Sequence, residues 1–333
     1  MNLFLQTEYE GDSYSVEGDT FNEAMEINDP FKIDYFNSIR VLGSCNGIVC
    51  LSKGNQICLM NPLTREYKIM EEKEEGYCFY NIHRNYGLGY DDTTEDFKLV
   101  EIVYFDHFSI FYSRISVCSF KNYSWSTISN IHYWKVNKDE LGIYLQGSLH
   151  WVGTTSEPNS SKRIVCVDIK KNIVREMFGP VALDCDAETK LGVLGGQLCV
   201  ICTWRNYYYI DVWAMKDYGC RDSWYKLFSI DKPFQFSVGQ HMGAFFFCAN
   251  GKILQKNDSK HIVYDPKQKV TTVESFEVPK LNIVPYVASL VSLNIGSYAR
   301  VRKSCIGTGN KLIFARNLMN PQKSVVDLIL GLY

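Results

Sequence analysis

The chain has 333 residues, of which 46% are hydrophobic and 22% are charged, so it is globular in composition and long enough for one large domain or two ordinary ones. Its formal net charge of -2 gives no overall field that would attract nucleic acid or an anionic membrane, and we expect neither as a partner. Aromatic residues reach 14%, and their abundance favours strands over helices.

The N-terminus, MNLFLQTEYEGDSYSVEGD, lacks the basic start, the long apolar run and the small-residue cleavage site of a secretory signal. The sequence also has no stretch of about 20 apolar residues that could span a bilayer. We therefore expect the protein in the cytoplasm, the nucleus or both. In such a reducing compartment the 12 cysteines are expected to be free thiols that pack as small hydrophobic residues.

The first predicted strands are NLFLQTEY and YSVEG, followed by a helical turn or two at TFNEAMEI. The segment GSCNGIVCLSKGNQICLMNPLTREYKIM, residues 43–70, then shows a pattern that returns along the chain. Asn46-Gly47 predicts a two-residue hairpin turn, because both central positions of such a turn need positive φ. An apolar strand around Ile57, the turn residues NPLTR and a short strand with Tyr67 complete the pattern.

The isoleucine of this pattern recurs about every 50 residues, which is close to the period of kelch repeats. The five aligned positions are Ile57, Ile115, Ile164, Ile210 and Ile262. Each is followed by a turn and a second short strand, and each is preceded by another turn and strand. Four of the preceding turns are predicted at Asn46-Gly47, Gln146-Gly147, Gly195-Gly196 and Asn250-Gly251. Each unit therefore holds about four antiparallel strands.

Four short strands cannot bury both faces of their sheet alone, and radial stacking of such units solves this problem in β-propellers. We expect an all-β, kelch-like β-propeller of six blades, with seven as the alternative. The sixth blade would combine the N-terminal strands with PYVASLVSLN, residues 285–294, from the other end of the chain. The predicted propeller domain spans residues 1–295, and residues 296–333 are expected to form an atypical, poorly ordered extension.

The sequence motifs predict no catalytic, cofactor or metal site. Cys199 and Cys202 stand three apart in an apolar strand, where they point to opposite faces and cannot both bind one ion, so we interpret them as core residues. The six histidines have no metalloprotease spacing, and His150 is expected to bond within its own blade. The acidic DDTTED, residues 91–96, lacks the calcium-loop pattern and is interpreted as a solvated hairpin turn. An enzyme built on a propeller is the least favoured interpretation.

With the units aligned, GSCNGIVCL, YGLGYDDTTEDFKLVEI, YLQGSLHWVG, IVCVDIKKNIVREM and IDVWAMKDYGCRDSWYKLFSI together resemble the F-box-associated domain of plant F-box proteins, and in particular the S-locus F-box-like group. The resemblance runs from about residue 3 to residue 294. It implies a kelch-like propeller that captures a protein substrate, while an N-terminal F-box binds the Skp adaptor of an SCF ubiquitin ligase. In S-locus relatives the ligand is a secreted, basic ribonuclease.

The sequence departs from this family pattern because no F-box precedes the first strand, so we expect the Skp adaptor and a cullin as partners only if an upstream F-box exists. The main hypothesis is a protein-interaction module that resembles the substrate-recognition domain of the ligase. The alternative is a truncated or decoy propeller that binds a target without ubiquitin-ligase function.

A blade with strand order a-b-c-d has its b–c loops and d–a linkers on one face, and these predicted loops are long and irregular. They cover residues 71–85, 106–113, 131–139, 154–162 and 231–241. Loops held by a rigid scaffold concentrate binding residues, and aromatic side chains anchor protein interfaces. The predicted protein-binding residues are the loop aromatics Phe108, Phe111, Tyr112, Tyr133, Trp134, Phe234 and Phe236 and the acidic Glu71, Glu72, Glu74 and Glu75, which would suit a basic ribonuclease.

Overall fold

In the computed structural model, the described residues are 2–7, 13–17, 24–27, 30–31, 39–71, 82–107, 110–131, 135–136, 140–154, 162–184, 187–204, 209–231, 245–247, 252–256, 261–274 and 281–293. These residues form strands β1 to β25 and two short 3-10 helices, η1 (Val181–Asp184) and η2 (Arg221–Ser223), with no α-helix among them. In the same residues, no helix is long and apolar enough to cross a membrane. The predicted all-β class is confirmed.

The described strands form six antiparallel sheets, in agreement with the six predicted units. Five of the sheets have four strands, and the remaining sheet has five. The chain also divides into two compact units. Unit 1 comprises Met1–Val41, Asn46–Glu71 and Gly243–Tyr333, and unit 2 comprises Leu42–Cys45 and Glu72–Met242.

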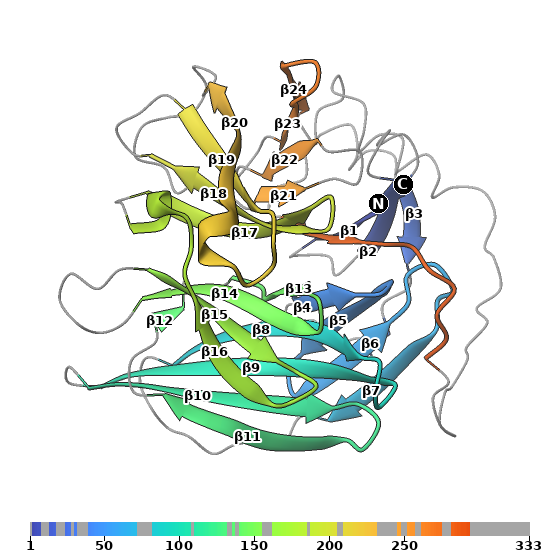
Figure 1. Ribbon diagram of the computed structural model, residues 1–333. Coiled ribbons are helices and arrows are strands. Elements are labelled where there is room, and N and C mark those ends of the chain that lie inside the picture. The colour runs from blue at the N-terminus through green and yellow to red at the C-terminus, as the bar shows by residue number, and fades with distance from the viewer. Residues whose placement is uncertain are drawn as a thin grey trace. The chain divides into compact units, whose positions relative to one another are not determined.

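One sheet of unit 1 joins the two ends of the chain. Its spatial order is β25 (Leu281–Tyr286), β1 (Asn2–Thr7), β2 (Ser13–Glu17) and β3 (Ala24–Ile27). Figure 1 shows β25, drawn in orange-red, running beside the blue β1, and Phe4 pairs with Val284 in the register. The prediction that both ends of the chain share one blade is confirmed.

Two details of that prediction were wrong. The last strand ends at Tyr286 instead of continuing to residue 294. Residues 24–27 form strand β3 where the sequence suggested a helical turn. The reason is burial: Ile27 is 2% exposed and packs in one cluster with Phe4 and Tyr286, which outweighs the weak helical preference of the segment.

The other two sheets with strands in unit 1 have simple up-and-down order. The first contains β4 (Arg40–Cys45), β5 (Ile48–Lys53), β6 (Gln56–Met60) and β7 (Tyr67–Glu71), and the second contains β21 (Phe245–Phe247), β22 (Ile253–Lys256), β23 (His261–Asp265) and β24 (Val270–Glu274). Cys50 and Cys58 are fully buried free thiols. They pack as small apolar residues, as predicted.

Unit 2 holds three consecutive sheets. Their strands are β8 (Ile82–Asp91), β9 (Asp96–His107), β10 (Ile110–Ser119) and β11 (Ser124–Ile131), then β12 (Lys135–Val136), β13 (Ile143–Leu145), β14 (Ser148–Thr154), β15 (Arg163–Asp168) and β16 (Ile173–Met177), then β17 (Glu188–Leu194), β18 (Gln197–Thr203), β19 (Tyr209–Met215) and β20 (Trp224–Asp231). In the second of these sheets both β12 and β13 pair with β14.

The five aligned isoleucines occupy equivalent places in five sheets. Each lies in the strand just before the last: the strands are β6, β10, β15, β19 and β23. The two-residue turns behave as predicted too, since Asn46 and Gly47 have φ of 48° and 85° and Gly195 and Gly196 have φ of 57° and 77°. The predicted turn at residues 250–251 lies outside the described residues.

The turns that follow three of these isoleucine strands share one hydrogen-bond pattern. Asn61, Asp168 and Asp265 each accept bonds at Oδ1 from the backbone N–H groups two and three residues further on. Such an Asx turn satisfies backbone donors that the hairpin leaves open. The repeat therefore has a chemical signature at the turn as well as an apolar one in the strand.

The core of unit 2 is tightest around Trp151 of β14, which is 1% exposed. Gly142 stands next to this ring, and a Cβ atom at Gly142 would overlap the indole. At Gly87 of β8 a Cβ would lie 2.9 Å from Trp151 Cζ2. Both glycines therefore make room for the indole by lacking a side chain.

We expect a Gly142→Ala substitution to destabilise the protein by about 3 kcal/mol, because the added methyl group overlaps a buried ring that has no free space. The control is Gly196→Ala, where no atom lies within 4 Å and only the φ of 77° is unfavourable. That variant should lose about 1 kcal/mol. Urea unfolding measures both, and a larger loss for Gly196→Ala would contradict this account of the core.

In unit 1, residues 287–293 form a strap over the turn that contains Asn61. The side-chain amide of Asn61, which is fully buried, donates to the carbonyl oxygens of Ser289 at 3.0 Å and Val291 at 2.8 Å. Ser289 Oγ donates to the carbonyl oxygen of Asn46, and the backbone N–H of Leu293 donates to Glu66 at 3.0 Å. The strap is thus fixed by polar contacts at both of its ends.

An Asn61→Asp substitution separates the two roles of this residue. Aspartate keeps the oxygen that forms the turn but places a buried carboxylate against two carbonyl oxygens, so we expect a loss of about 3 kcal/mol at pH 7. The loss should shrink at acidic pH, where the protonated carboxyl can donate. The control Asp265→Asn changes the same kind of turn away from the strap and should cost less than about 0.5 kcal/mol. Equal losses in urea unfolding would refute the role of the strap bonds.

Candidate functional site

The structure places only three of the eleven predicted binding residues. Glu71 is the exposed last residue of β7 in unit 1, whereas Phe111 and Tyr112 lie in β10 of unit 2. The other eight lie outside the described residues; they are Phe108, Tyr133, Trp134, Phe234, Phe236, Glu72, Glu74 and Glu75. The predicted set therefore stays a prediction as a site.

Three of the predicted loops were wrong in their extent. Within the predicted loop 131–139, Lys135–Val136 form strand β12. The segment 106–113 is mostly strand, because β9 continues to His107 and β10 begins at Ile110, with these two residues paired. The loop predicted to end at residue 85 stops earlier, since β8 begins at Ile82. In the segment 106–113, the apolar and aromatic residues favour strand pairing over a loop. Figure 1 shows the resulting long β9–β10 hairpin.

A different site is formed in unit 2 by two neighbouring sheets. It is a cavity of about 380 Å³. Its lining comes from the start of β15, the segment after β16, β19 and the loop between β19 and β20; the residues are Lys162, Arg163, Phe178, Gly179, Pro180, Val181, Trp213, Arg221, Asp222 and Trp224. We call it the Phe178 pocket.

The segment after β16 turns sharply and leaves two apolar side chains in solvent. The N–H of Leu183 donates to the carbonyl oxygen of Pro180 at 2.8 Å, and Leu183 itself is 1% exposed. A Cβ at Gly179 would overlap the Leu183 side chain, so the close approach requires glycine here. Anchored in this way, the segment presents Phe178 at 45% and Val181 at 82% exposure.

The loop between β19 and β20 is held by its own hydrogen bonds. Ser223 Oγ donates within the loop to the carbonyl oxygens of Asp217 at 2.9 Å and Cys220 at 2.8 Å, and the N–H of Lys216 donates to the carbonyl oxygen of Ser223. Gly219 has a φ of 82°, which permits the bend. This order fixes Arg221 at the rim of the Phe178 pocket.

Phe178 is the centre of a cluster of arginine and aromatic side chains. The Cζ atoms of Arg163 and Arg221 lie 4.8 Å and 4.5 Å from the centre of its ring, within the range of cation–π contacts. The indole N–H of Trp224 donates to the carbonyl oxygen of Phe178 at 3.0 Å. Two cations and one tryptophan thus hold a half-exposed phenylalanine in place.

Trp213 forms the other aromatic wall of the pocket. Lys226 Nζ lies 5.5 Å from the centre of its ring, and the same ammonium forms an ion pair with Asp211 at 2.9 Å. Within the described residues the buried indole nitrogen of Trp213 has no hydrogen-bond partner. Packing and the lysine therefore position this ring.

His150 forms a buried polar pair with Tyr218 away from the Phe178 pocket lining. Its Nδ1 lies 2.9 Å from the carbonyl oxygen of Ile143, which can only accept, so Nδ1 carries the proton and Nε2 accepts from the Tyr218 hydroxyl at 2.7 Å. The bond to Ile143 lies within the sheet, as predicted. The bond to Tyr218 reaches the β19–β20 loop and was not predicted.

Burial lowers the pKa of His150 from 6.5 to about 4, although the bond to Ile143 opposes the shift. Because the folded form resists protonation, this group contributes its full stability above pH 6.5 and loses it as the pH falls towards 4. The total effect is about 3 kcal/mol. Over this pH window, His150 should add to the slope of unfolding free energy against pH an amount that corresponds to the binding of about one proton. We expect His150→Gln, which cannot titrate, to lack this contribution. Urea unfolding between pH 7.5 and 4 measures this slope. An unchanged slope in His150→Gln would refute the assignment of the pH dependence to His150.

The buried cysteines are packing residues. Cys199 and Cys202 are fully buried in β18, as the sequence predicted. Burial raises the pKa of Cys199 to about 12, and of Cys45 to about 12, against a small opposing effect of backbone hydrogen bonds. Protonated thiols of this kind are poor nucleophiles and poor metal ligands.

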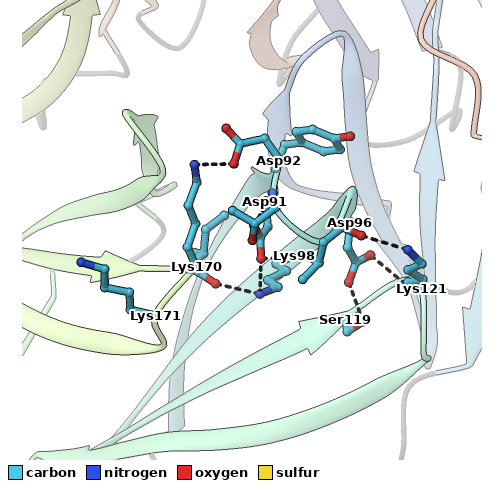
Figure 2. A network of polar contacts seen from close by, with 12 residues as sticks. Asp91, Asp92, Asp96, Lys98, Ser119, Lys121, Lys170 and Lys171 are labelled. Carbon is cyan, nitrogen blue, oxygen red and sulfur yellow. Dashed lines mark hydrogen bonds and ion pairs between the residues drawn. The ribbon is translucent and has the colours of Figure 1, made fainter.

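The acidic hairpin at residues 91–96 is a structural link, shown in Figure 2. The predicted hairpin turn is confirmed and its residues 92–95 are exposed, but Asp91 and Asp96 at its two ends are buried, so the predicted solvation was wrong for these two residues. Burial would raise the pKa of Asp91, yet hydrogen bonds from Lys98 and two threonines lower it well below its usual range. Lys98 also donates to the carbonyl oxygen of Ile169 at 2.8 Å and so joins two sheets of unit 2.

The carboxylate of Asp96 is similarly occupied. It accepts from Ser119 Oγ at 2.5 Å and from the backbone N–H of Lys121 at 2.8 Å. At the exposed tip Asp92 forms an ion pair with Lys170 of the neighbouring sheet. Asp96 thus stabilises its own sheet, while Asp92 and the Lys98 partner of Asp91 link this hairpin to the next sheet.

The repeated four-stranded sheets and the aromatic pocket define an all-β protein of the propeller class. The chain matches the family described as F-box associated beta propeller domain over residues 3–293. It therefore belongs to that family, and the resemblance and the propeller fold inferred from the sequence are confirmed.

Curated proteins similar to this chain include F-box proteins of Arabidopsis thaliana. The F-box protein CPR1 is 28% identical over 312 residues, covering 84% of this chain and 72% of the relative. An F-box/kelch-repeat protein is 30% identical over 200 residues, covering 59% and 53%. A further F-box protein is 27% identical, covering 68% of this chain and 63% of its own length. The chain thus spans between about half and three quarters of these relatives.

Solved structures resemble the chain more distantly. An oligogalacturonate lyase in complex with manganese superposes with a TM-score of 0.47 at 10% identity, covering 78% of this chain and 69% of the lyase. The propeller domain of a trilobed protease from Pyrococcus furiosus gives a TM-score of 0.40 at 12% identity, covering 73% and 85%. Scores at this level carry no argument about function.

Proposed function

We propose that the chain is the target-binding module of an F-box protein, and that it selects a protein substrate for an SCF ubiquitin ligase without performing catalysis itself. The family assignment supports a protein-interaction module, and the curated relatives are F-box proteins. The longer protein would contact the Skp adaptor and a cullin through an F-box, in the cytoplasm, the nucleus or both.

The observation that carries the proposal is the Phe178 pocket. Tryptophan, arginine and exposed aromatic side chains are the residue types that dominate binding energy at protein interfaces. Here two tryptophans and two arginines surround one half-exposed phenylalanine in a cavity of about 380 Å³. Ligand cavities of several hundred Å³ can take one or a few side chains of a partner.

The narrower prediction of a secreted ribonuclease as ligand rests on the S-locus resemblance and on acidic residues near 71–75. Glu71 is the member of that group among the described residues, and it is exposed at the end of β7. A basic ligand would be attracted to the exposed carboxylate of Glu71. A basic ribonuclease is therefore a proposal separate from the Phe178 pocket.

The proposed function is tested by expressing the tagged protein from its gene in plant cells, as wild type and as Phe178→Ala. Because Phe178 is 45% exposed, its truncation should leave the fold intact while capture of the target falls about tenfold. The measurement is quantitative mass spectrometry of co-purified proteins, restricted to those that also accumulate when cullin ligases are inhibited.

The matched control is Ile173→Ala, which removes an apolar side chain of the same unit that is 47% exposed and does not line the pocket. It should capture the same proteins as wild type. Identical captured sets for Phe178→Ala and wild type, or the absence of any protein that accumulates on ligase inhibition, would overturn the proposal.

A further inference from the structure

We propose that the Phe178 pocket binds an acidic segment of a protein partner, with glutamate or aspartate carboxylates meeting the arginines and an adjoining apolar side chain meeting the exposed rim. The inference deepens the proposed function and depends on it, because it assigns the chemistry of the segment that the pocket selects. This acidic segment is opposite in charge to the basic ligand that the acidic loop residues predict.

The first argument is the arrangement of the two arginines. A guanidinium that lies against an aromatic ring uses its face for that contact, and the N–H groups at its edge stay available for hydrogen bonds in the guanidinium plane. Arg163 and Arg221 both contact the one ring of Phe178. These contacts fix both guanidinium groups beside the same cavity before any ligand arrives, and one N–H of Arg163 already donates to the carbonyl oxygen of Lys162.

The second argument is that Arg221 has no acidic partner within the described residues. Its guanidinium contacts the Phe178 ring, and it forms no ion pair with any described residue. By contrast, three buried carboxylates of unit 2 each have a cationic partner: Asp91 pairs with Lys98, Asp168 with Arg175 and Asp211 with Lys226. An exposed arginine held in place without a carboxylate is suited to receive one from another molecule.

The third argument is the charge of the pocket lining. Lys162, Arg163 and Arg221 face a single acidic residue, Asp222. Lys162 and Arg163 are also oriented by backbone carbonyl oxygens, those of Ala187 and Lys162 respectively. The excess of cations favours an anionic segment and disfavours a basic one.

The fourth argument is the apolar rim. Val181 is 82% exposed and stands beside Phe178, so the cavity opens past two uncovered apolar side chains. Burial of such groups contributes about 25 cal/mol per Å² of apolar surface. A segment with an apolar residue next to its carboxylates would use both features of the site.

The test is fluorescence anisotropy with the full chain and a labelled octapeptide in which three glutamates surround one leucine. Matched peptides carry glutamine, lysine or phosphoserine in place of the glutamates. We expect the glutamate peptide to bind, the glutamine peptide to bind about tenfold more weakly, and the lysine peptide not to bind. Affinity for the glutamate peptide should fall as salt is raised.

The protein variants assign the binding to the pocket. Arg221→Gln should weaken the glutamate peptide about tenfold, and Arg221→Lys should fall between, because lysine keeps the charge but loses the planar fork. The control is Lys171→Gln, which removes an exposed cation of the same unit that does not line the pocket. It should bind as wild type does.

The inference would be overturned by equal affinity for the glutamate and glutamine peptides, by an unchanged affinity in Arg221→Gln, or by no binding of any peptide. A clear preference for the phosphoserine peptide would also overturn it, because the ligand would then be a phosphorylated segment. The capture of target proteins in cells distinguishes failure of this inference from failure of the proposed function. If captured proteins depend on Phe178 but not on Arg221, the pocket binds a protein target and only the acidic chemistry is wrong.

Discussion

The structure depends on the burial of both faces of small sheets. A sheet of four short strands has two broad faces, and it gains enough stability only when another element covers each of them. In unit 2 this requirement is met by clusters that draw residues from successive sheets, such as the one in which Trp151 packs with Ile115 and Val167. Positions 87 and 142 require glycine because their backbone lies so close to an indole that a Cβ atom would overlap it.

Polar contacts between sheets supplement this apolar packing. Lys98 reaches from the β8–β9 hairpin to the carbonyl oxygen of Ile169, while His150 and Tyr218 connect the next two sheets. Each of these buried groups has a partner, so its desolvation is compensated. These hydrogen bonds therefore fix the positions of neighbouring sheets of unit 2, in addition to the apolar packing between them.

Much of the fold could be predicted from the sequence because its signals are local. The isoleucine strands, the two-residue turns and the Asx residues that follow them are encoded within a few residues of each other. Some features that depend on distant partners were missed, although the shared sheet of the two chain ends was predicted from the repeat. Strand β3 forms because Ile27 is buried beside Phe4 and Tyr286, and no short window of sequence contains that contact.

The Phe178 pocket could not be predicted for the same reason. Its lining comes from segments that are up to about 60 residues apart, and the contact of Arg163 and Arg221 with one ring exists only in the folded sheets. One sequence signal was available: KDYGCRDS is longer than the other turns that follow the isoleucine strands and carries an arginine beside an aromatic strand. None of the eleven predicted binding residues is among the residues that line this pocket.

The pairing of β1 with β25 has a consequence for how the protein is made. Unit 2 is encoded almost without interruption by residues 72–242, so its sheets can form as soon as that stretch has left the ribosome. The sheet containing β1 must wait for residues 281–286, and until then β1 lacks its partner on one edge. During synthesis there is therefore a stage at which unit 2 can be folded while β1 still has an unpaired edge. Chaperones or another copy of the chain can contact that edge.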